Sequence, residues 1–221
     1  MAGLTSSTIG RKYAMALSAM FLLIFLVTHL STNMTSVIGE NAFNTASHFM
    51  GYNPLIQFVM QPILMFAVVF HFVMGFILEI RNQSARPIGY NMNNGSANST
   101  WMSRNMIISG AVILAFLALH FYDFWFPEIT YKYLKPQVAD ETRYYAELQH
   151  KFKDLWRVIL YVIAFVLLGL HLAHGFQSSF QSIGARHPKY TPVIRAFGNW
   201  YSVLIPFGFI FVAVYHYVTQ L

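Results

Sequence analysis

Among the nine histidines of this sequence, His29, His71, His120 and His171 stand in four different apolar stretches. An imidazole ring is costly to bury among apolar groups unless its nitrogens have a partner. The 221 residues include no cysteine, which excludes iron–sulfur clusters, thiolate zinc sites, disulfides and thiol nucleophiles from this chain. Any metal would therefore be held by nitrogen, oxygen or thioether sulfur, and these histidines are the obvious nitrogen donors.

The stretches that carry the four rings are long enough to cross a membrane. Hydrophobic residues make up 56% of the chain and charged residues only 10%, against roughly 25% charged residues in a soluble domain. At about 20 apolar residues per span, the sequence predicts five spans: Met15–Ser31, Leu55–Ile80, Met106–Phe126, Leu155–Phe180 and Trp200–Tyr217. We expect an all-α integral membrane bundle of five transmembrane helices and one domain over 1–221, kinked but not broken at Pro62 and Pro206.

The basic residues indicate how the bundle is oriented, because cytoplasmic loops are enriched in lysine and arginine. Eight lie in the N-terminal segment and in the loops after the second and fourth spans: Arg11, Lys12, Arg81, Arg86, Arg104, Arg186, Lys189 and Arg195. The basic residues of the opposite side lie in or beside one long loop, where acidic residues nearly neutralise them. We therefore predict a cytoplasmic N-terminus and an external C-terminus. Because the net charge of +6 is spread over membrane loops, we expect no nucleic-acid partner.

With this topology the four histidines form two layers. His29 and His120 lie near the outer ends of the first and third spans, whereas His71 and His171 lie deeper in the second and fourth. The layers are separated by roughly 15 to 20 Å at 1.5 Å per residue. Two imidazoles from facing helices fill both axial positions of a haem iron, which suits electron transfer and not oxygen binding. The sequence thus predicts two b-type haems, each bound by one pair.

A glycine follows each inner histidine by four residues, Gly75 after His71 and Gly175 after His171. A residue four positions on lies on the same helix face, so glycine removes the side chain that would meet a porphyrin. Close packing of two helices is the alternative explanation. His174 lies one turn from His171 and is a second candidate ligand, although no glycine follows it at that spacing.

Further polar residues are candidates for binding around the haems. Four lie by position within range of the inner haem propionates: Arg81, Arg104, Ser18 and Trp101. His48 lies in an outer loop or a short amphipathic helix, where it could exchange protons with a quinol or be a surface histidine. Glu40 and Asp123 are carboxylates near the outer interface that spacing alone does not rank.

Several short motifs follow one another along the chain in an order that, taken together, is specific. They are the opening Ser-Ser-Thr-Ile-Gly-Arg-Lys12, then Met15-Ala-Leu, His29-Leu-Ser-Thr-Asn33, Ala42-Phe-Asn with His48-Phe-Met, and the two His-x-x-x-Gly helices. In this order the chain resembles the cytochrome b558 subunit of succinate dehydrogenase and fumarate reductase, in the branch with one large five-helix anchor. The resemblance covers nearly the whole chain.

The resemblance implies that His29 and His120 bind the distal haem, and that His71 and His171, and not His174, bind the proximal haem. It implies a flavoprotein subunit with FAD and an iron–sulfur subunit on the cytoplasmic face of a bacterial inner membrane, with menaquinone as the quinone. Some members of the family have an acidic residue beside the distal haem, and the stretch around Gly51 offers no carboxylate.

The sequence contains no dinucleotide-binding glycine motif, so succinate chemistry must belong to another chain. The interpretation we favour is the electron-transfer and quinone-reactive subunit of a succinate:quinone oxidoreductase. One alternative is a di-haem cytochrome b of a hydrogenase or formate dehydrogenase, which uses the same ligands. The other is a haem-free transporter in which buried histidines relay protons.

Overall fold

The computed structural model describes residues 7–84, 104–134 and 140–221, apart from the side chain of residue 8. Within these ranges the chain is helical and contains no strand. The elements are α1 (Thr8–Ile38), α2 (Glu40–Tyr52), the π-helical turn η1 (Ile56–Met60), α3 (Gln61–Ser84), α6 (Met106–His120), the π-helical turn η2 (Phe121–Trp125), α7 (Phe126–Ile129), the π-helical turn η3 (Thr130–Leu134), α8 (Arg143–Lys151), α9 (Leu155–Ser182) and α10 (Thr191–Val218).

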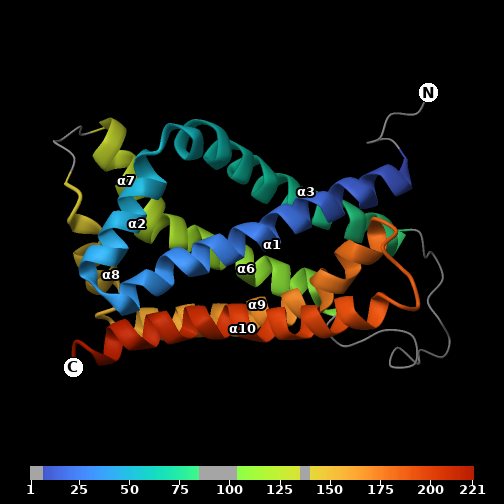
Figure 1. The fold of residues 1–221 in the computed structure, drawn as a ribbon. Helices are drawn as coiled ribbons and strands as arrows, with labels where there is room; N and C mark the ends of the chain where they lie inside the picture. Colours follow the sequence, from blue (N-terminus) through green and yellow to red (C-terminus); the bar gives the residue numbers. More distant parts are fainter. Residues whose placement is uncertain (1–6, 85–103, 135–139) are drawn as a thin grey trace.

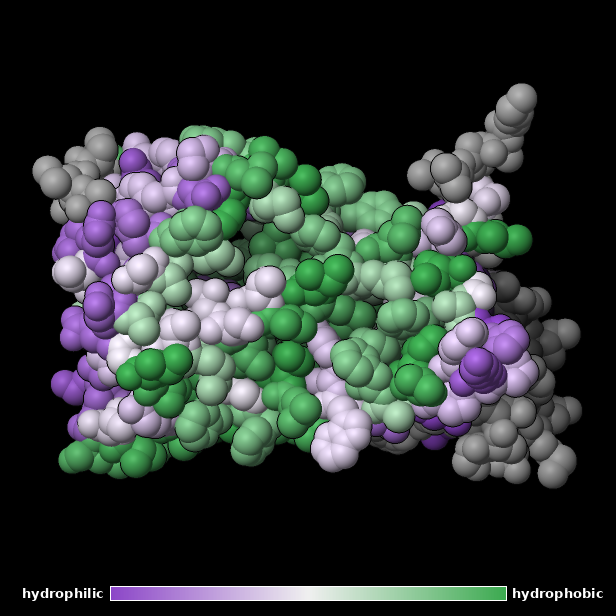
Figure 2. All heavy atoms as spheres, in the orientation of Figure 1, coloured by the Kyte–Doolittle hydropathy of each residue, from purple (hydrophilic) through white to green (hydrophobic). Residues whose placement is uncertain are grey.

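Five helical segments in the described ranges are long and apolar enough to cross a membrane, which confirms the predicted fold class. They cover Ile9–Ile38, Ile56–Ser84, Met106–Leu134, Leu155–Ser182 and Thr191–Val218. Each extends beyond the predicted apolar stretch, because polar residues at the ends continue the same helix. Hydrophobic residues occupy the middle of the face seen in Figure 2, and hydrophilic residues gather at the end that carries α2 and α8. We refer to this end as the α8 end.

Four of the long helices form a ring. α1 packs against α3, α3 against α6, α6 against α9, and α9 against α1. α1 and α6 run towards the α8 end, whereas α3 and α9 run away from it (Figure 1). Because the order around the ring is α1, α3, α6 and α9, α1 faces α6 across its centre, and α3 faces α9. The fifth long helix, α10, packs outside the ring against α9 and α1.

Prolines shape two of the spans without ending them. The carbonyls four residues before Pro62 and Pro127 belong to Phe58 and Asp123, which lie in the π-helical turns η1 and η2. A proline clashes with the carbonyl at that position and removes one hydrogen bond, which accounts for a local widening of the helix there. Pro206 lies inside α10, and the helix continues through it, as expected.

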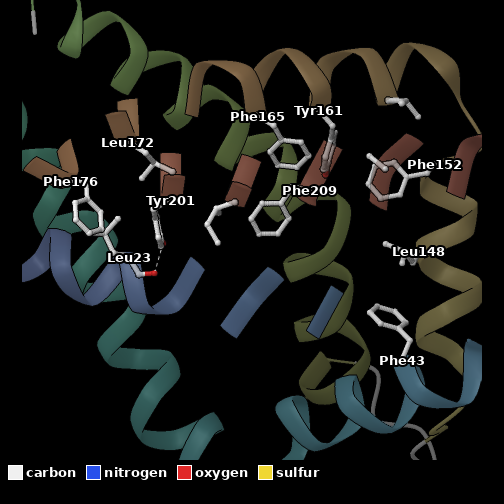
Figure 3. Packing of buried hydrophobic residues seen from close by; sticks show 13 residues of the cluster. Leu23, Phe43, Leu148, Phe152, Tyr161, Phe165, Leu172, Phe176, Tyr201 and Phe209 are labelled. Atoms are coloured by element: carbon white, nitrogen blue, oxygen red, sulfur yellow. Dashed lines mark hydrogen bonds between the residues drawn. The ribbon is translucent and has the colours of Figure 1, made fainter. Parts of the chain in front are cut away.

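The described core lies mainly between α9 and α10, with additions from α1, α2 and α8. Figure 3 shows Phe165 of α9 stacked on Phe209 of α10, with ring centroids 5.2 Å apart, and Tyr161 beside them. Near the other end of the cluster, Tyr201 donates a hydrogen bond to the carbonyl oxygen of Leu23 at 2.6 Å. This bond ties α10 to α1 and so attaches the fifth helix to the ring.

Candidate functional site

The four histidines meet as two pairs across the centre of the ring. His29 of α1 faces His120 of α6, with ring centroids 5.8 Å apart and planes at 84°. His71 of α3 faces His171 of α9, with centroids 6.4 Å apart and planes at 68°. Both pairs therefore join helices that face each other across the bundle.

Two serines, one on α1 and one on α6, contact the inner pair and so show at which height along these two helices it lies. Ser18 of α1 lies 3.2 Å from Nδ1 of His71, and Ser109 of α6 lies 3.1 Å from Nδ1 of His171. Both serines precede the outer histidine of their own helix by 11 residues. At 1.5 Å per residue, the two pairs are separated by roughly 16 Å along the bundle.

The donor set of each pair suits one kind of metal group. Among the residues that the structure describes, no three His, Cys, Asp or Glu side chains gather at one point, whereas a structural zinc ion needs four ligands and a catalytic one three. An iron already bound by four porphyrin nitrogens needs two further ligands. Metal–imidazole bonds of about 2.0 Å place two opposed ring centroids roughly 6 Å apart, which fits both pairs.

The surroundings of the outer pair are apolar and partly open. A cavity of about 170 Å³ adjoins His29 and His120, and its walls are almost wholly aromatic and aliphatic, with Tyr161 and Asn33 as the other polar residues. Phe25 stacks on His29, with centroids 5.2 Å apart, and Phe116 lies 5.8 Å from His120. Apolar walls with a few polar groups are typical of a cofactor site.

The two predicted glycines lie where helices of the ring approach each other. A Cβ on Gly75 would meet the methyl end of Met15 at 3.6 Å, and a Cβ on Gly175 would meet that of Met106 at 3.4 Å. These are contacts with the flexible ends of side chains and not with backbone. Space at these glycines is therefore bounded only by atoms that can move aside.

The other predicted residues lie at varied distances from the pairs. His174 is half-buried on α9, but the ring that faces His71 is that of His171. Arg81 is exposed in the last turn of α3, ten residues beyond His71, and Arg104 is exposed beside the start of α6. Trp101 lies outside the described residues.

Asp123, which spacing could not rank, is buried next to the outer pair. Only 1% of it is exposed. Tyr161 donates a hydrogen bond to Oδ2 at 3.0 Å, and Arg157 Nε lies 3.4 Å from the same oxygen. Lys151 Nζ lies 3.8 Å from Oδ1. Since the ring of Tyr161 also lies 6.3 Å from that of His120, this network connects the outer histidine to charged side chains at the α8 end.

A second ionic cluster holds the α8 end together. Glu128 pairs with Lys132 at 2.6 Å and with Arg143 of α8, and Lys132 donates a hydrogen bond to the carbonyl oxygen of Gly51 at 2.6 Å. Burial and, secondarily, the Glu128 carboxylate raise the pKa of Tyr144, so its hydroxyl stays neutral beside these charges. The cluster connects α2, the end of the third span and α8.

A carboxylate of the Glu128 cluster lies beside Gly51. Oε1 of Glu128 lies 3.4 Å from the position of a Cβ on Gly51, so a carboxylate from another helix occupies the space beside this glycine. His48 lies nearby on α2, with its ring stacked on Tyr52 at 4.5 Å and its Nε2 3.5 Å from Glu141. His48 is not among the residues that line the cavity at the outer pair.

The sequence contains a repeat that could have revealed Ser109. Met15, Ser18, Leu23, Phe25, Leu26 and His29 of α1 recur as Met106, Ser109, Leu114, Phe116, Leu117 and His120 of α6, each 91 residues later. The His-x-x-x-Gly-Phe segment that begins at His71 recurs at His171, 100 residues later. α1 runs parallel to α6, and α3 runs parallel to α9 (Figure 1). The two halves are therefore related by an approximate twofold axis along the bundle.

Comparison with protein families adds an independent result. Residues 82–188 match the model of the Succinate dehydrogenase/Fumarate reductase transmembrane subunit. The match covers just under half of the chain, which is therefore similar to this family of membrane anchors. The matched part of the anchor carries His120 and His171, whereas His29 and His71 precede it. Searches of curated proteins and of solved structures gave no significant match.

The matched family consists, by its description, of transmembrane subunits of succinate dehydrogenase and fumarate reductase. The five long apolar helices make it a multi-pass membrane protein. The histidine pairs therefore lie inside the membrane-spanning part of the chain.

Proposed function

We propose that this anchor carries two b haems, each held by one histidine pair, and passes electrons between an iron–sulfur subunit and membrane quinone. The observation that carries the proposal is the pairing of His29 with His120 and of His71 with His171 at two levels of one bundle. A bound haem would supply one-electron transfer at each level. Two protein ligands per iron leave no open position for oxygen.

In this proposal, the residues around the histidine pairs determine what can reach them. Apolar walls around the outer pair disfavour the entry of water, and each pair lies diagonally across the ring of helices. The inner pair lies nearer the end opposite α8, which the basic loops predict to be cytoplasmic. We propose that the FAD-containing flavoprotein and the iron–sulfur subunit dock at that end, in a bacterial inner membrane.

The α8 end is our candidate for quinone chemistry. Glu128 beside Gly51, the buried Asp123 and the partly exposed His48 give this end several groups able to accept or donate protons. Tyr161 lines the outer cavity and binds Asp123 directly, so a polar route leads from the outer pair to that end. Menaquinone is the proposed substrate, and Arg81, Arg104 and Trp101 remain candidates for contacts with haem propionates. Ser18 is not, because its hydroxyl donates to the carbonyl oxygen of Met15 and lies beside His71 Nδ1.

The test is a visible spectrum of the purified, reduced anchor followed by single substitutions. The wild-type protein is expected to show the alpha band of b haem with two haems per chain. His71→Ala is expected to remove the inner haem and retain the outer one, whereas His29→Ala is expected to do the reverse. His174→Ala is the matched control, because its ring lies one turn from His171 but faces no second histidine among the described ring contacts, and it should retain both haems.

Three outcomes would count against the proposal. A wild-type protein that lacks the alpha band when purified with its partner subunits would favour the proton-relay alternative. Equal haem content in the His71→Ala, His29→Ala and His174→Ala variants would reject the pairing. Co-purification of a hydrogenase or formate dehydrogenase subunit, with no flavoprotein present, would favour the other alternative.

A further inference from the structure

We propose that Ser18 and Ser109 are paired positioning residues of the inner haem, which hold Nδ1 of His71 and His171 protonated and thereby lower that haem's reduction potential. This inference rests on the proposed function, since it concerns how the inner pair binds iron. It adds two residues, one of them not predicted from the sequence, and a property that distinguishes the two haems.

The direction of each serine–histidine hydrogen bond follows from counting protons. A serine hydroxyl has one proton. Ser18 donates it to the carbonyl oxygen of Met15 at 2.7 Å, and Ser109 donates its own to that of Met106 at 2.9 Å. Towards the histidine each serine oxygen can therefore only accept, so the ring nitrogen Nδ1 carries the hydrogen.

That assignment leaves Nε2 of each inner histidine with a free lone pair. A neutral imidazole has one protonated and one unprotonated nitrogen, and the unprotonated one is the metal ligand. Metal-bound histidines characteristically donate their other N–H to an acceptor, which fixes the ring and makes the ligand more basic. The serines thus prepare both rings of the inner pair for the same metal through the same atom.

The internal repeat supports this assignment independently of the distances. Ser18 and Ser109 occupy equivalent positions, as do the methionines three residues before them. Both serines contact a histidine on the neighbouring helix of their own half, and those histidines are also equivalent. The same polar contact is thus made twice around the axis on which the inner iron would lie.

The outer pair has no corresponding contact in the described structure. Nδ1 of His120 is buried and has no hydrogen-bond partner. Aromatic rings pack against both outer histidines instead, Phe25 on His29 and Phe116 near His120. The two haems would therefore have ligands of different basicity, because only the inner pair donates its Nδ1 hydrogens to serine oxygens.

A more basic imidazole stabilises the oxidised iron, and hydrogen bonds around a haem are one of the means by which a protein sets its potential. Ser18→Ala and Ser109→Ala should each raise the reduction potential of the inner haem. The expected change is roughly threefold to tenfold in the equilibrium constant for reduction, the order expected of one hydrogen bond. For a one-electron couple this is about 30 to 60 mV.

The experiment is a redox titration of the alpha band in the anchor purified with its partner subunits. Two one-electron components are expected in the wild type, and each single variant should move one of them upwards while the other stays in place. The double variant should move the same component further. Ser18→Thr, which retains the hydroxyl, should restore a potential close to that of the wild type.

Ser36→Ala provides a matched control. Ser36 donates to the carbonyl oxygen of Asn33 at 2.6 Å and lies 2.8 Å from Nε2 of His216, so its bonding is the same in kind. His216 is buried on α10 and belongs to neither pair. This variant should leave both potentials unchanged.

Unchanged potentials in the double variant with both haems bound would overturn the inference and leave the proposed function intact. Loss of both haems from a double variant that is still inserted would also overturn it, because the serines would then be structural residues only. Loss of the inner haem alone, with Ser18→Thr retaining it, would support the inference. Absence of haem from the wild type would instead reject the proposed function.

Discussion

Two buried tyrosines provide a direct measure of what the Asp123 network contributes to stability. Tyr161 donates its hydroxyl hydrogen to the Asp123 carboxylate at 3.0 Å, and Tyr201 donates its own to the neutral carbonyl oxygen of Leu23 at 2.6 Å. Both rings are buried among aromatic residues (Figure 3). Tyr161→Phe and Tyr201→Phe therefore remove one hydrogen bond each, retain the ring, and differ in the charge of the acceptor.

The loss of unfolding free energy expected in each variant depends on the charge of the acceptor. Hydrogen bonds between helices inside membrane proteins contribute about 0.6 kcal/mol on average and about 1.7 kcal/mol at most, and a charged partner roughly doubles the strength of a bond. Tyr201→Phe should thus cost about 0.6 kcal/mol of the free energy of unfolding, and Tyr161→Phe about 1 to 2 kcal/mol. In the Tyr161→Phe variant, Oδ2 of Asp123 retains Arg157 Nε as its neighbour, at the longer distance of 3.4 Å.

Unfolding of the purified anchor in mixed detergent micelles by increasing dodecyl sulfate, followed by tryptophan fluorescence, would give both free energies. An Asp123→Asn background supplies the remaining test, because it removes the charge but retains an acceptor for Tyr161. In that background the cost of Tyr161→Phe should fall to that of Tyr201→Phe. A cost for Tyr161→Phe no larger than that for Tyr201→Phe in the original background would refute the ionic network described here.

Three further predictions concern packing and the α8 end. Gly169→Ala would place a Cβ 3.0 Å from the carbonyl oxygen of Ser202 and should destabilise the α9–α10 contact by about 1 to 3 kcal/mol; an unchanged melting temperature would contradict this close approach. In Gly75→Ala the added Cβ meets only the flexible end of Met15 at 3.6 Å, so this variant should retain both haems. Gly75→Trp should displace the inner haem. Retention of both haems by Gly75→Trp would mean that the glycine serves helix packing alone. Glu128→Gln should cost about 1 kcal/mol, because the carboxylate is 23% exposed, and should speed proteolysis within α8; equal cleavage rates would show that the cluster does not hold this helix.

The parts of the fold that depend on chain-wide patterns could be predicted from the sequence. Apolar length determined the number of spans, and the positions of His29 and His120 on their spans placed both rings at the same level. The ends of the spans could not be predicted in the same way. The third span continues past Phe126 to Leu134, although the added residues include Glu128 and Lys132, because these two charges pair with each other and need no water.

The residues missed by sequence reasoning are those whose role depends on a neighbouring helix. His216 lies in the fifth span, and its Nε2 has a hydrogen-bond partner in Ser36 of α1, 180 positions away in the chain. Asp123 was named as a carboxylate near the outer interface but could not be ranked, because its partners Tyr161 and Arg157 come from α9. His150 lies in α8, a short polar helix that is not among the spans predicted from apolar length.

The repeat also shows where the two halves of the bundle cease to be equivalent. The histidines, the serines and the phenylalanines that contact the outer pair recur at fixed offsets, whereas Asp123 corresponds to Thr32 and Tyr161 to Gln61. Both replacements are uncharged, so the ionic network exists in the second half only. Electron transfer along an axis needs ligands arranged around that axis, which a repeat supplies. Proton exchange with the surface, as proposed for this chain, needs only one polar route. The candidate route lies on the side of α6 and α9, where Lys151 and Arg157 reach Asp123 from the α8 end.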